Sequence, residues 1–324
     1  MSWTLQSVAV VGSGAIGLYY GGRLAAAGED VRFLLRSDFE AVKKDGIRCE
    51  SIHGNFDLPM MKGFRTPEEI GPVDLIIVSW KATSNGHLRE ILPPLLHANT
   101  QVLTLQNGLG NCEEIAAVVG AERVLGALCF VCLNRLSPGF VSHTAGGRIT
   151  IGEFVPDERG RAKEVVSRFK SAGIPAELGE PLAESQWTKL VWNVPFNGLS
   201  IAEGGMTTDE LLRSTEIETE IRCLMREVVT AARAIGLSLS DDLIDFNIER
   251  TRPMGPYRPS SMIDYLEDRE VEIGPIWEEP LRRGKAAGVA MPHLERLLGR
   301  IRKCLADRNS VEMQHLTSLN TIYL

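Results

Sequence analysis

The chain has 324 residues, which is long for a single hydrophobic core and sufficient for two domains. Its 44% hydrophobic and 24% charged residues are ordinary for a globular protein. With 35 basic against 42 acidic residues and a net charge of −7, spread without blocks of like charge, the composition argues against nucleic acid or an anionic membrane as a partner.

The lack of a recognisable targeting signal and the pattern of cysteines both favour a cytoplasmic protein. The N-terminus lacks a basic region, glycines interrupt its apolar run, and no apolar stretch approaches the roughly 18 residues of a membrane helix. The six cysteines form no disulfide framework for so long a chain. Cys129 and Cys132 make a CxxC motif inside a predicted buried strand, without a second ligand pair, so we expect no metal site.

The first predicted element is a buried strand over residues 7–11, and a helix is expected from Leu18 to Ala27. Between them lies a glycine turn made of Gly12, Ser13, Gly14, Ala15, Ile16 and Gly17. A strand, a glycine turn and a helix start together present backbone N–H groups to a pyrophosphate. Gly12 permits the tight turn, Gly14 lets the pyrophosphate approach, and Gly17 lets the helix pack against the strand. The segment therefore predicts a dinucleotide site.

The second predicted strand, residues 31–35, indicates which dinucleotide is bound. NAD-binding chains usually carry an Asp or Glu about 20 residues past the glycines, where it binds the ribose 2′-hydroxyl. Here the strand leads to Arg36, whose guanidinium fork suits a 2′-phosphate. Glu29 and Asp30 precede the strand and cannot take that role. We therefore expect NADP(H).

Strands and helices then alternate through the first half of the chain. Strands are expected at residues 73–80, 101–105, 124–133 and 148–151, a helix at residues 87–96 and another from about Cys112, with turns at Pro138-Gly139 and Gly146-Gly147. Lys81 and Asn107 each follow an apolar strand, as Gly12 and Arg36 do. Ligands of doubly wound sheets bind at the carboxyl ends of the strands, so we expect these four residues at one edge.

Helical periodicity dominates beyond Pro181. Helices are predicted at residues 184–201, 216–235, 279–288 and 293–306, with Ser260 or Ser261 capping another, while residues 307–324 carry little signal. The fold class is α/β, with a Rossmann-type parallel sheet followed by a mostly α-helical domain. We predict an NADP-binding Rossmann domain over residues 1–182 and a helical substrate-binding and catalytic domain over residues 183–324.

Three polar residues share one face of the helix over residues 184–201. Lys189, Asn193 and Asn197 are four residues apart, so each lies about 6 Å further along the helix axis. Most of their neighbours are apolar and would bury the helix. A Lys in such a setting suits proton transfer near neutral pH, although a surface stripe with an extended Lys side chain has the same spacing.

Taken in order, the motifs resemble those of the ketopantoate reductase family over nearly the whole chain. They are the glycine turn, Lys81, Asn107, the helix with Lys189, Asn193 and Asn197, the Ser260-Ser261-Met262 segment and Glu272. The resemblance implies NADPH-dependent reduction of 2-dehydropantoate to (R)-pantoate, a step in pantothenate and coenzyme A biosynthesis.

The resemblance also implies roles for individual residues. Lys189 would be the general acid that protonates the keto oxygen, with Glu272 beside the nicotinamide ribose and substrate. Asn193, Asn197 and Ser261 would bind the substrate. Asn107 would contact cofactor and substrate, whereas Arg36 and Lys81 would meet the adenosine phosphate end. A nearby ammonium stabilises and neutralises the alkoxide that forms when hydride adds to a keto carbon.

Two departures from the family pattern bear on the substrate. Many members carry a further substrate-binding Asn where this chain has the segment at residues 204–208, and the spacer from Ser261 to Glu272 is about one residue short. A reductase of another 2-keto acid therefore stays open as an alternative. A non-catalytic NADP(H)-binding sensor would not need Lys189 and Glu272. His-based hydroxyacid or opine dehydrogenases fit poorly, although His143 could lie near the site.

The sequence does not decide the oligomeric state. The amphipathic pattern of residues 216–235 fits pairing with a second copy in a homodimer and burial within one domain equally well.

Overall fold

A computed structural model describes residues 3–157, 159–179 and 181–321, and the chain divides into two compact units. Unit 1 is Met1–Gln186 and unit 2 is Trp187–Leu324. The division falls inside helix α7 (Leu182–Ala202), whose first turn packs into unit 1 through Leu182. Across the described residues, no helix has both the length and the hydropathy needed to cross a bilayer.

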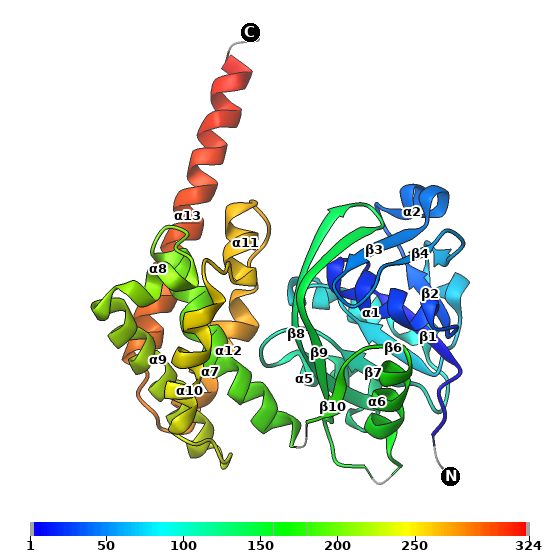
Figure 1. Ribbon diagram of the computed structural model, residues 1–324, viewed down its shortest axis with the longest axis horizontal. Coiled ribbons are helices and arrows are strands. Elements are labelled where there is room, and N and C mark those ends of the chain that lie inside the picture. The colour runs from blue at the N-terminus through cyan, green and yellow to red at the C-terminus, as the bar shows by residue number, and fades with distance from the viewer. Residues whose placement is uncertain (1–2, 158, 180, 322–324) are drawn as a thin grey trace. The chain divides into compact units, whose positions relative to one another are not determined.

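In its described residues, unit 1 contains a ten-stranded mixed sheet (Figure 1). The strands are ordered β4 (Phe56–Leu58), β3 (Ile47–Ser51), β9 (Phe140–Glu153), β8 (Val124–Ser137), β7 (Gln101–Thr104), β6 (Leu75–Val78), β1 (Ser7–Val11), β2 (Asp30–Leu34) and β5 (Lys62–Phe64), with β10 (Ala176–Leu178) beside β9. Strands β1, β2, β5, β6, β7 and β8 are parallel, and in chain order they lie as 3-2-1-4-5-6. That order is typical of doubly wound dinucleotide-binding folds and reverses between β1 and β6. The predicted Rossmann-type sheet is confirmed.

Short helices and turns connect the strands of unit 1. They are α1 (Ala15–Ala26), α2 (Phe39–Asp45), α3 (Pro67–Ile70), α4 (Leu88–Ile91), α5 (Asn111–Val119) and α6 (Arg161–Ser171), with 3₁₀ turns η1 (Ala82–His87), η2 (Pro93–Leu95) and η3 (Ala121–Arg123). The single helix predicted over residues 87–96 is wrong, because the chain there forms η1, α4 and η2 in succession. Pro93 and Pro94 have no N–H to donate and interrupt the helix.

The long strands β8 and β9 form an antiparallel hairpin around the predicted Pro138-Gly139 turn. The second predicted turn, Gly146-Gly147, is wrong: both glycines lie inside β9, with φ of 72° and 111°. The pairing register shifts there, since Phe130 faces Arg148 whereas Val131 faces Gly146. Positive φ and an extra residue are features of a β-bulge, in which glycine bends a continuing strand.

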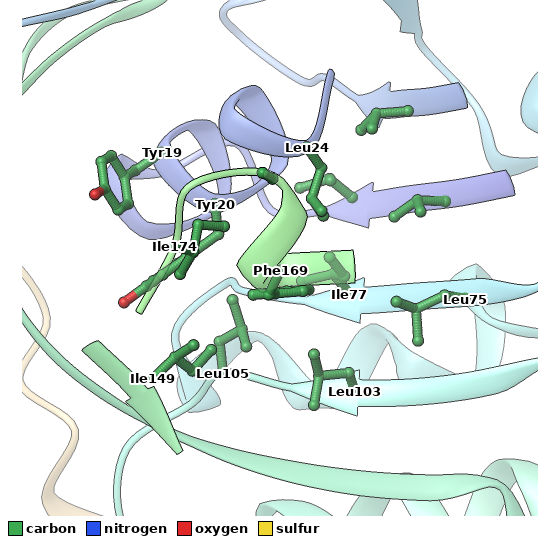
Figure 2. Close-up of a cluster of buried hydrophobic side chains, with 14 of the residues drawn as sticks. Tyr19, Tyr20, Leu24, Leu75, Ile77, Leu103, Leu105, Ile149, Phe169 and Ile174 are labelled. Carbon is green, nitrogen blue, oxygen red and sulfur yellow. The ribbon is translucent and has the colours of Figure 1, made fainter. Parts of the chain in front are cut away.

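Side chains of the central strands alternate between two hydrophobic clusters on opposite faces of the sheet. In β1, Val8 and Val10 belong to one cluster and Ala9 and Val11 to the other. Helices α1 and α6 supply side chains to the first cluster, and α4 and α5 to the second. Figure 2 shows members of the first cluster, among them Tyr19, Tyr20, Leu24, Leu75, Ile77, Leu103, Leu105, Ile149, Phe169 and Ile174.

All the regular structure in the described residues of unit 2 is helical, as the sequence predicts. After α7 it contains α8 (Thr208–Arg213), α9 (Thr215–Ala234), α10 (Asp242–Thr251), the 3₁₀ turn η4 (Arg252–Met254), α11 (Ser260–Leu266), the π-helical turn η5 (Gly274–Glu278), α12 (Glu279–Ala286) and α13 (Pro292–Thr321). The helix predicted to end at Ala306 continues to Thr321, so most of the segment at residues 307–324 is helical backbone. Residues 322–324 lie outside the described residues.

A carboxylate from α9 fixes the start of α13. Glu227, which is only 9% exposed, accepts hydrogen bonds from the backbone N–H groups of His293 (2.8 Å) and Leu294 (2.9 Å). These N–H groups belong to the first helical turn, where no intrahelical acceptor exists. The negative charge also complements the positive end of the helix dipole.

We expect Glu227→Ala to destabilise the protein by about 2 kcal/mol, because two charge-assisted hydrogen bonds to N–H groups of the first turn of α13 are lost. Urea unfolding followed by circular dichroism at 222 nm measures the change. The matched control is Glu249→Ala on α10, where an exposed ion pair with Arg252 is lost and about 0.5 kcal/mol or less is expected. Equal losses in the two variants would contradict the capping role.

Candidate functional site

The glycine turn after β1 requires glycine at two positions for close backbone approach. Gly12 has φ of 106°, and a Cβ there would lie 2.4 Å from the backbone nitrogen of Trp80. A Cβ on Gly17 would lie 2.0 Å from the carbonyl oxygen of Gly12 and 2.4 Å from Oγ of Ser79. The Ser79 hydroxyl donates to that same carbonyl at 2.7 Å. Gly12 and Gly17 therefore serve the packing of the strand, turn and helix.

Gly14 differs from the other two glycines because the space beside it is open. A Cβ there would meet nothing within 4 Å, and its φ of −73° is accessible to any residue. Gly14 is the N-cap of α1, which begins at Ala15, three residues earlier than predicted. The helix has neither a side-chain cap nor an acidic residue in its first turn. Its first N–H groups therefore have no capping side chain and can bind an anion.

Arg36 lies just past β2, at the carboxyl end of that strand, and its side chain is exposed. Within the described residues its guanidinium forms no ion pair. The acidic residues at the opposite end of β2 are engaged: Asp30 pairs with Arg32 (2.8 Å) and Lys62 (2.7 Å), and Glu29 pairs with Arg168 (3.2 Å). Asp38, two residues past Arg36, is also engaged, in an ion pair with Arg135 (2.6 Å).

The parallel register brings the predicted residues of unit 1 to one edge of the sheet. Val11, the last residue of β1, pairs with Val78 of β6, and Val78 pairs with Thr104 of β7. Lys81 follows β6 and Asn107 follows β7, and both are half-buried. Four neighbouring strands, β1, β2, β6 and β7 (Figure 1), are therefore followed at their carboxyl ends by the glycine turn, Arg36, Lys81 and Asn107, respectively. That edge is where ligands of this sheet type bind.

A polar network at this edge was not predicted from the sequence. Asn85 of η1 accepts hydrogen bonds from the indole N–H of Trp80 (3.0 Å) and from Nε2 of Gln106 (2.7 Å). Its Nδ2 donates to Oδ1 of Asn111 (3.2 Å) and to Oε2 of Glu114 (2.6 Å). The five residues come from four separate segments, and only the spacing of polar residues after strands hints at them.

In unit 2, α7 carries the predicted stripe of polar residues. Lys189 is half-buried, Asn193 is 7% exposed and Asn197 is 2% exposed, so the stripe runs from a more accessible end into the interior. The amide of Asn197 donates to the carbonyl of Asn193 at 3.2 Å and accepts from the backbone N–H of Ser261 at 2.9 Å. Two predicted substrate-binding residues, Asn197 and Ser261, are therefore in contact.

The segment from α11 to η5 carries Ser261 and Glu272. The predicted serine cap of α11 is wrong, because Pro259 is the N-cap and neither serine caps the helix through its side chain. Ser261 is 3% exposed and lies in the first turn, where the Asn197 amide satisfies its N–H. Glu272 is half-buried and immediately precedes η5 in the chain.

Trp277 of η5 holds this segment against α7. Its indole N–H donates to the carbonyl of Val194 at 2.9 Å, and the ring is completely buried. A Cβ on Gly198 would lie 2.9 Å from the indole nitrogen, so glycine is needed for this contact. Trp277 thus fixes the π-helical turn after Glu272 beside the helix that carries Lys189.

His143 lies in the interior of unit 1 and has structural partners. Its Nδ1 is 2.8 Å from Oγ of Ser51, and its Nε2 is 3.1 Å from the carbonyl oxygen of Ala145. Burial lowers the pKa of His143, and the nearby His53 and Arg23 lower it further. No cluster of three or more His, Cys, Asp or Glu side chains in the described residues is arranged to hold a metal ion.

Comparison with known proteins defines the family. The sequence model described as "Ketopantoate reductase PanE/ApbA" matches residues 8–156, and its C-terminal counterpart matches residues 182–304. The chain is 39% identical, over 94% of its length and 96% of the relative's, to a protein from Nostoc sp. named 2-dehydropantoate 2-reductase.

Solved structures extend the match to three dimensions. A crystal structure of 2-dehydropantoate 2-reductase from Geobacter metallireducens GS-15 superposes with a TM-score of 0.89 at 44% identity, covering 92% of this chain and 99% of that one. A D-mandelate dehydrogenase bound to NADH and anilino(oxo)acetate shares the fold, with a TM-score of 0.86 at 22% identity over 94% of this chain and 99% of that one. The chain belongs to the ketopantoate reductase family.

Proposed function

We propose that the protein catalyses the NADPH-dependent reduction of 2-dehydropantoate to (R)-pantoate. Support comes from the family match over both units and from relatives of that name at 39–44% identity. The observation that carries the proposal is the stripe of Lys189, Asn193 and Asn197, with Asn197 bonded to Ser261. It supplies an acid and amide groups of the kind that reduction of a 2-keto acid requires.

Unit 1 is the proposed cofactor-binding unit, and its residues fit NADPH. The open side of Gly14 and the uncapped start of α1 suit the pyrophosphate, and the exposed guanidinium of Arg36 suits the 2′-phosphate. The proposed cofactor-binding residues of unit 1 are the glycine turn, Arg36, Lys81 and Asn107, and the resemblance to the family also assigns Glu272 to the cofactor. When bound, NADPH supplies the hydride.

Unit 2 is the proposed substrate-binding and catalytic unit. We assign Lys189 as the general acid. As hydride adds to the carbonyl carbon, the π electron pair of the C=O bond is displaced to the oxygen and forms an O–H bond with the Nζ proton of Lys189. The Asn193 side chain makes no hydrogen bond within the described residues although only 7% of the residue is exposed, so its amide is available to a polar group of the substrate. Ser261 is assigned to the substrate carboxylate, and Glu272 to orienting Lys189 or a hydroxyl.

The test is NADPH oxidation at 340 nm with 2-dehydropantoate and a panel of other 2-keto acids. The proposal predicts kcat/KM for 2-dehydropantoate of about 10⁴ M⁻¹s⁻¹ or more, well above the rest. Binding of NADPH with slow turnover of 2-dehydropantoate would favour a different 2-keto acid. Binding with no turnover of any would favour a sensor.

A different 2-keto acid is the second candidate, favoured by one segment of unit 2. The resemblance to the family implies another substrate-binding Asn within residues 204–208, and this segment instead contains Thr207, the N-cap of α8. The Thr207 hydroxyl lies 2.6 Å from Oδ1 of Asp209 and 2.8 Å from Oε2 of Glu210, and its N–H donates to Glu210 at 2.8 Å. Thr207 is thus occupied by helix capping, and it does not replace that Asn.

We also propose that the protein is cytoplasmic. All six cysteines are free thiols, two of them buried, which supports a reducing environment such as the cytoplasm.

The three glycines of the turn give a direct prediction. We expect Gly14→Ala to leave the melting temperature unchanged, because its Cβ has room, but to raise the Kd for NADPH at least tenfold, because the methyl group occupies the side open to the pyrophosphate. Gly17→Ala, with its Cβ 2.0 Å from the Gly12 carbonyl oxygen, is expected to lower the melting temperature by several degrees. Fluorescence titration and thermal circular dichroism measure both quantities. Unchanged NADPH affinity in Gly14→Ala would place the pyrophosphate elsewhere.

A further inference from the structure

The side-chain amide of Asn85 is fully used in the network at the carboxyl edge of the sheet. A primary amide can accept two hydrogen bonds through its oxygen and donate two through its nitrogen. Asn85 makes all four, with Trp80 and Gln106 as donors to its oxygen and Asn111 and Glu114 as acceptors from its nitrogen. Such complete use fixes the orientation of the amide.

The partners of Asn85 are adjacent to the two predicted cofactor residues of this edge. Trp80 directly precedes Lys81, and Gln106 directly precedes Asn107. Asn111 also donates from Nδ2 to the backbone carbonyl of Asn107 at 2.9 Å. One side chain therefore joins the segment after β6, the segment after β7 and the start of α5.

Packing does little to hold the turn that carries Asn85. None of the six residues of η1 is buried, so no apolar side chain within the turn anchors it to the core. Gln106, by contrast, is 8% exposed, and its Oε1 accepts from the hydroxyl of Thr104 at 2.9 Å, which fixes its own amide against β7. The hydrogen bonds of Asn85 thus transfer the rigidity of β7 and α5 to the turn beside Lys81.

We propose that Asn85 is a positioning residue for the cofactor: it holds the segments bearing Lys81 and Asn107 in the arrangement that binds NADP(H). The inference rests on the proposed function, and Asn85 itself need not touch the ligand. Groups that orient binding residues in this way affect affinity although they make no contact with the ligand.

The experiment measures the Kd for NADPH by fluorescence titration and the melting temperature by circular dichroism. We expect Asn85→Ala to raise the Kd at least tenfold, while KM for the keto acid at saturating NADPH changes less than twofold. The matched control is Asn99→Ala, an exposed Asn just before the opposite end of β7, with the Kd unchanged. A lower melting temperature with unchanged Kd would show a structural role alone and overturn the proposal.

A second set of variants tests the donor and acceptor pattern and covers a failure of Asn85→Ala to fold. In Asn85→Asp, a carboxylate oxygen faces the carboxylate of Glu114, and we expect the Kd to rise. Adding Glu114→Gln restores a donor opposite the new oxygen, so the double variant should recover part of the NADPH affinity, whereas Glu114→Gln alone should change it little. Absence of recovery would contradict the proposed arrangement.

The wild-type titration separates this inference from the proposed function. No NADPH binding by the wild-type protein would overturn both. Binding that is equally tight in the wild-type protein, Asn85→Ala and Asn85→Asp would overturn the positioning role and leave the proposed function standing.

Discussion

Replacing Lys189 by alanine is expected to lower kcat for 2-keto acid reduction by about 10²–10⁴-fold, the usual contribution of a general acid. The Kd for NADPH should change less than twofold, because the proposed cofactor contacts of unit 1 remain. Stopped-flow or steady-state oxidation of NADPH at 340 nm measures the rate, and a fluorescence titration measures the affinity. Lys189 is half-buried, and the ten residues that follow it in the helix are all buried. A water molecule therefore cannot easily take the place of the missing ammonium group.

Two further variants identify the chemical property that matters at this position. Lys189→Arg keeps the positive charge, but a guanidinium does not release a proton near neutral pH, so kcat should stay low. Lys303→Ala removes an exposed ammonium from α13 of the same unit and should leave kcat unchanged. Wild-type turnover in Lys189→Ala would refute the assignment as general acid.

Replacing Arg36 by aspartate is expected to weaken NADPH binding by about 100-fold and NADH binding by less than threefold. The change removes a charge-assisted hydrogen bond to the 2′-phosphate, worth about 1.5–3 kcal/mol, and adds repulsion. NADH lacks that phosphate, so its affinity depends on contacts that the substitution does not remove. Titrating each variant with both cofactors gives the ratio of affinities directly.

Lys163→Asp is the control for the altered net charge. It makes the same change of two charge units at an exposed site on α6, within the same unit. We expect similar, small losses for both cofactors through long-range electrostatics, reduced at high salt. Equal losses of NADPH and NADH in Arg36→Asp would mean that Arg36 does not bind the 2′-phosphate.

Local patterns sufficed to predict the elements that carry the proposed site. The apolar run of β1 and the glycines after it identify a strand, turn and helix, and the 3.6-residue period identifies α7 and α9. The same patterns place Arg36, Lys81 and Asn107 after strands. The position of Arg36 after the second strand also predicted its 2′-phosphate role. The roles of Lys81, Asn107, Ser261 and Glu272 came from the resemblance to a family, because polar residues after a strand or in a loop do not specify a ligand.

The features that were missed depend on contacts between distant segments. Asn85 has no local signal, since its partners extend to Glu114 and meet only once β6, β7 and α5 are in place. The local sequence predicts a turn at Gly146-Gly147, and the β-bulge is evident only from the pairing of this segment with β8. The predicted serine cap of α11 was wrong because Asn197, 64 residues earlier, satisfies the Ser261 N–H.

The unequal surroundings of the three glycines have a consequence for how such a motif persists over evolutionary time. Alanine at position 12 or 17 would collide with backbone atoms, so selection for folding alone preserves those glycines. Position 14 has no such steric constraint. In a descendant that had lost its dinucleotide, the outer glycines would remain while the middle one drifted. A glycine kept at position 14 therefore indicates ligand binding, whereas glycines kept at positions 12 and 17 indicate only the fold.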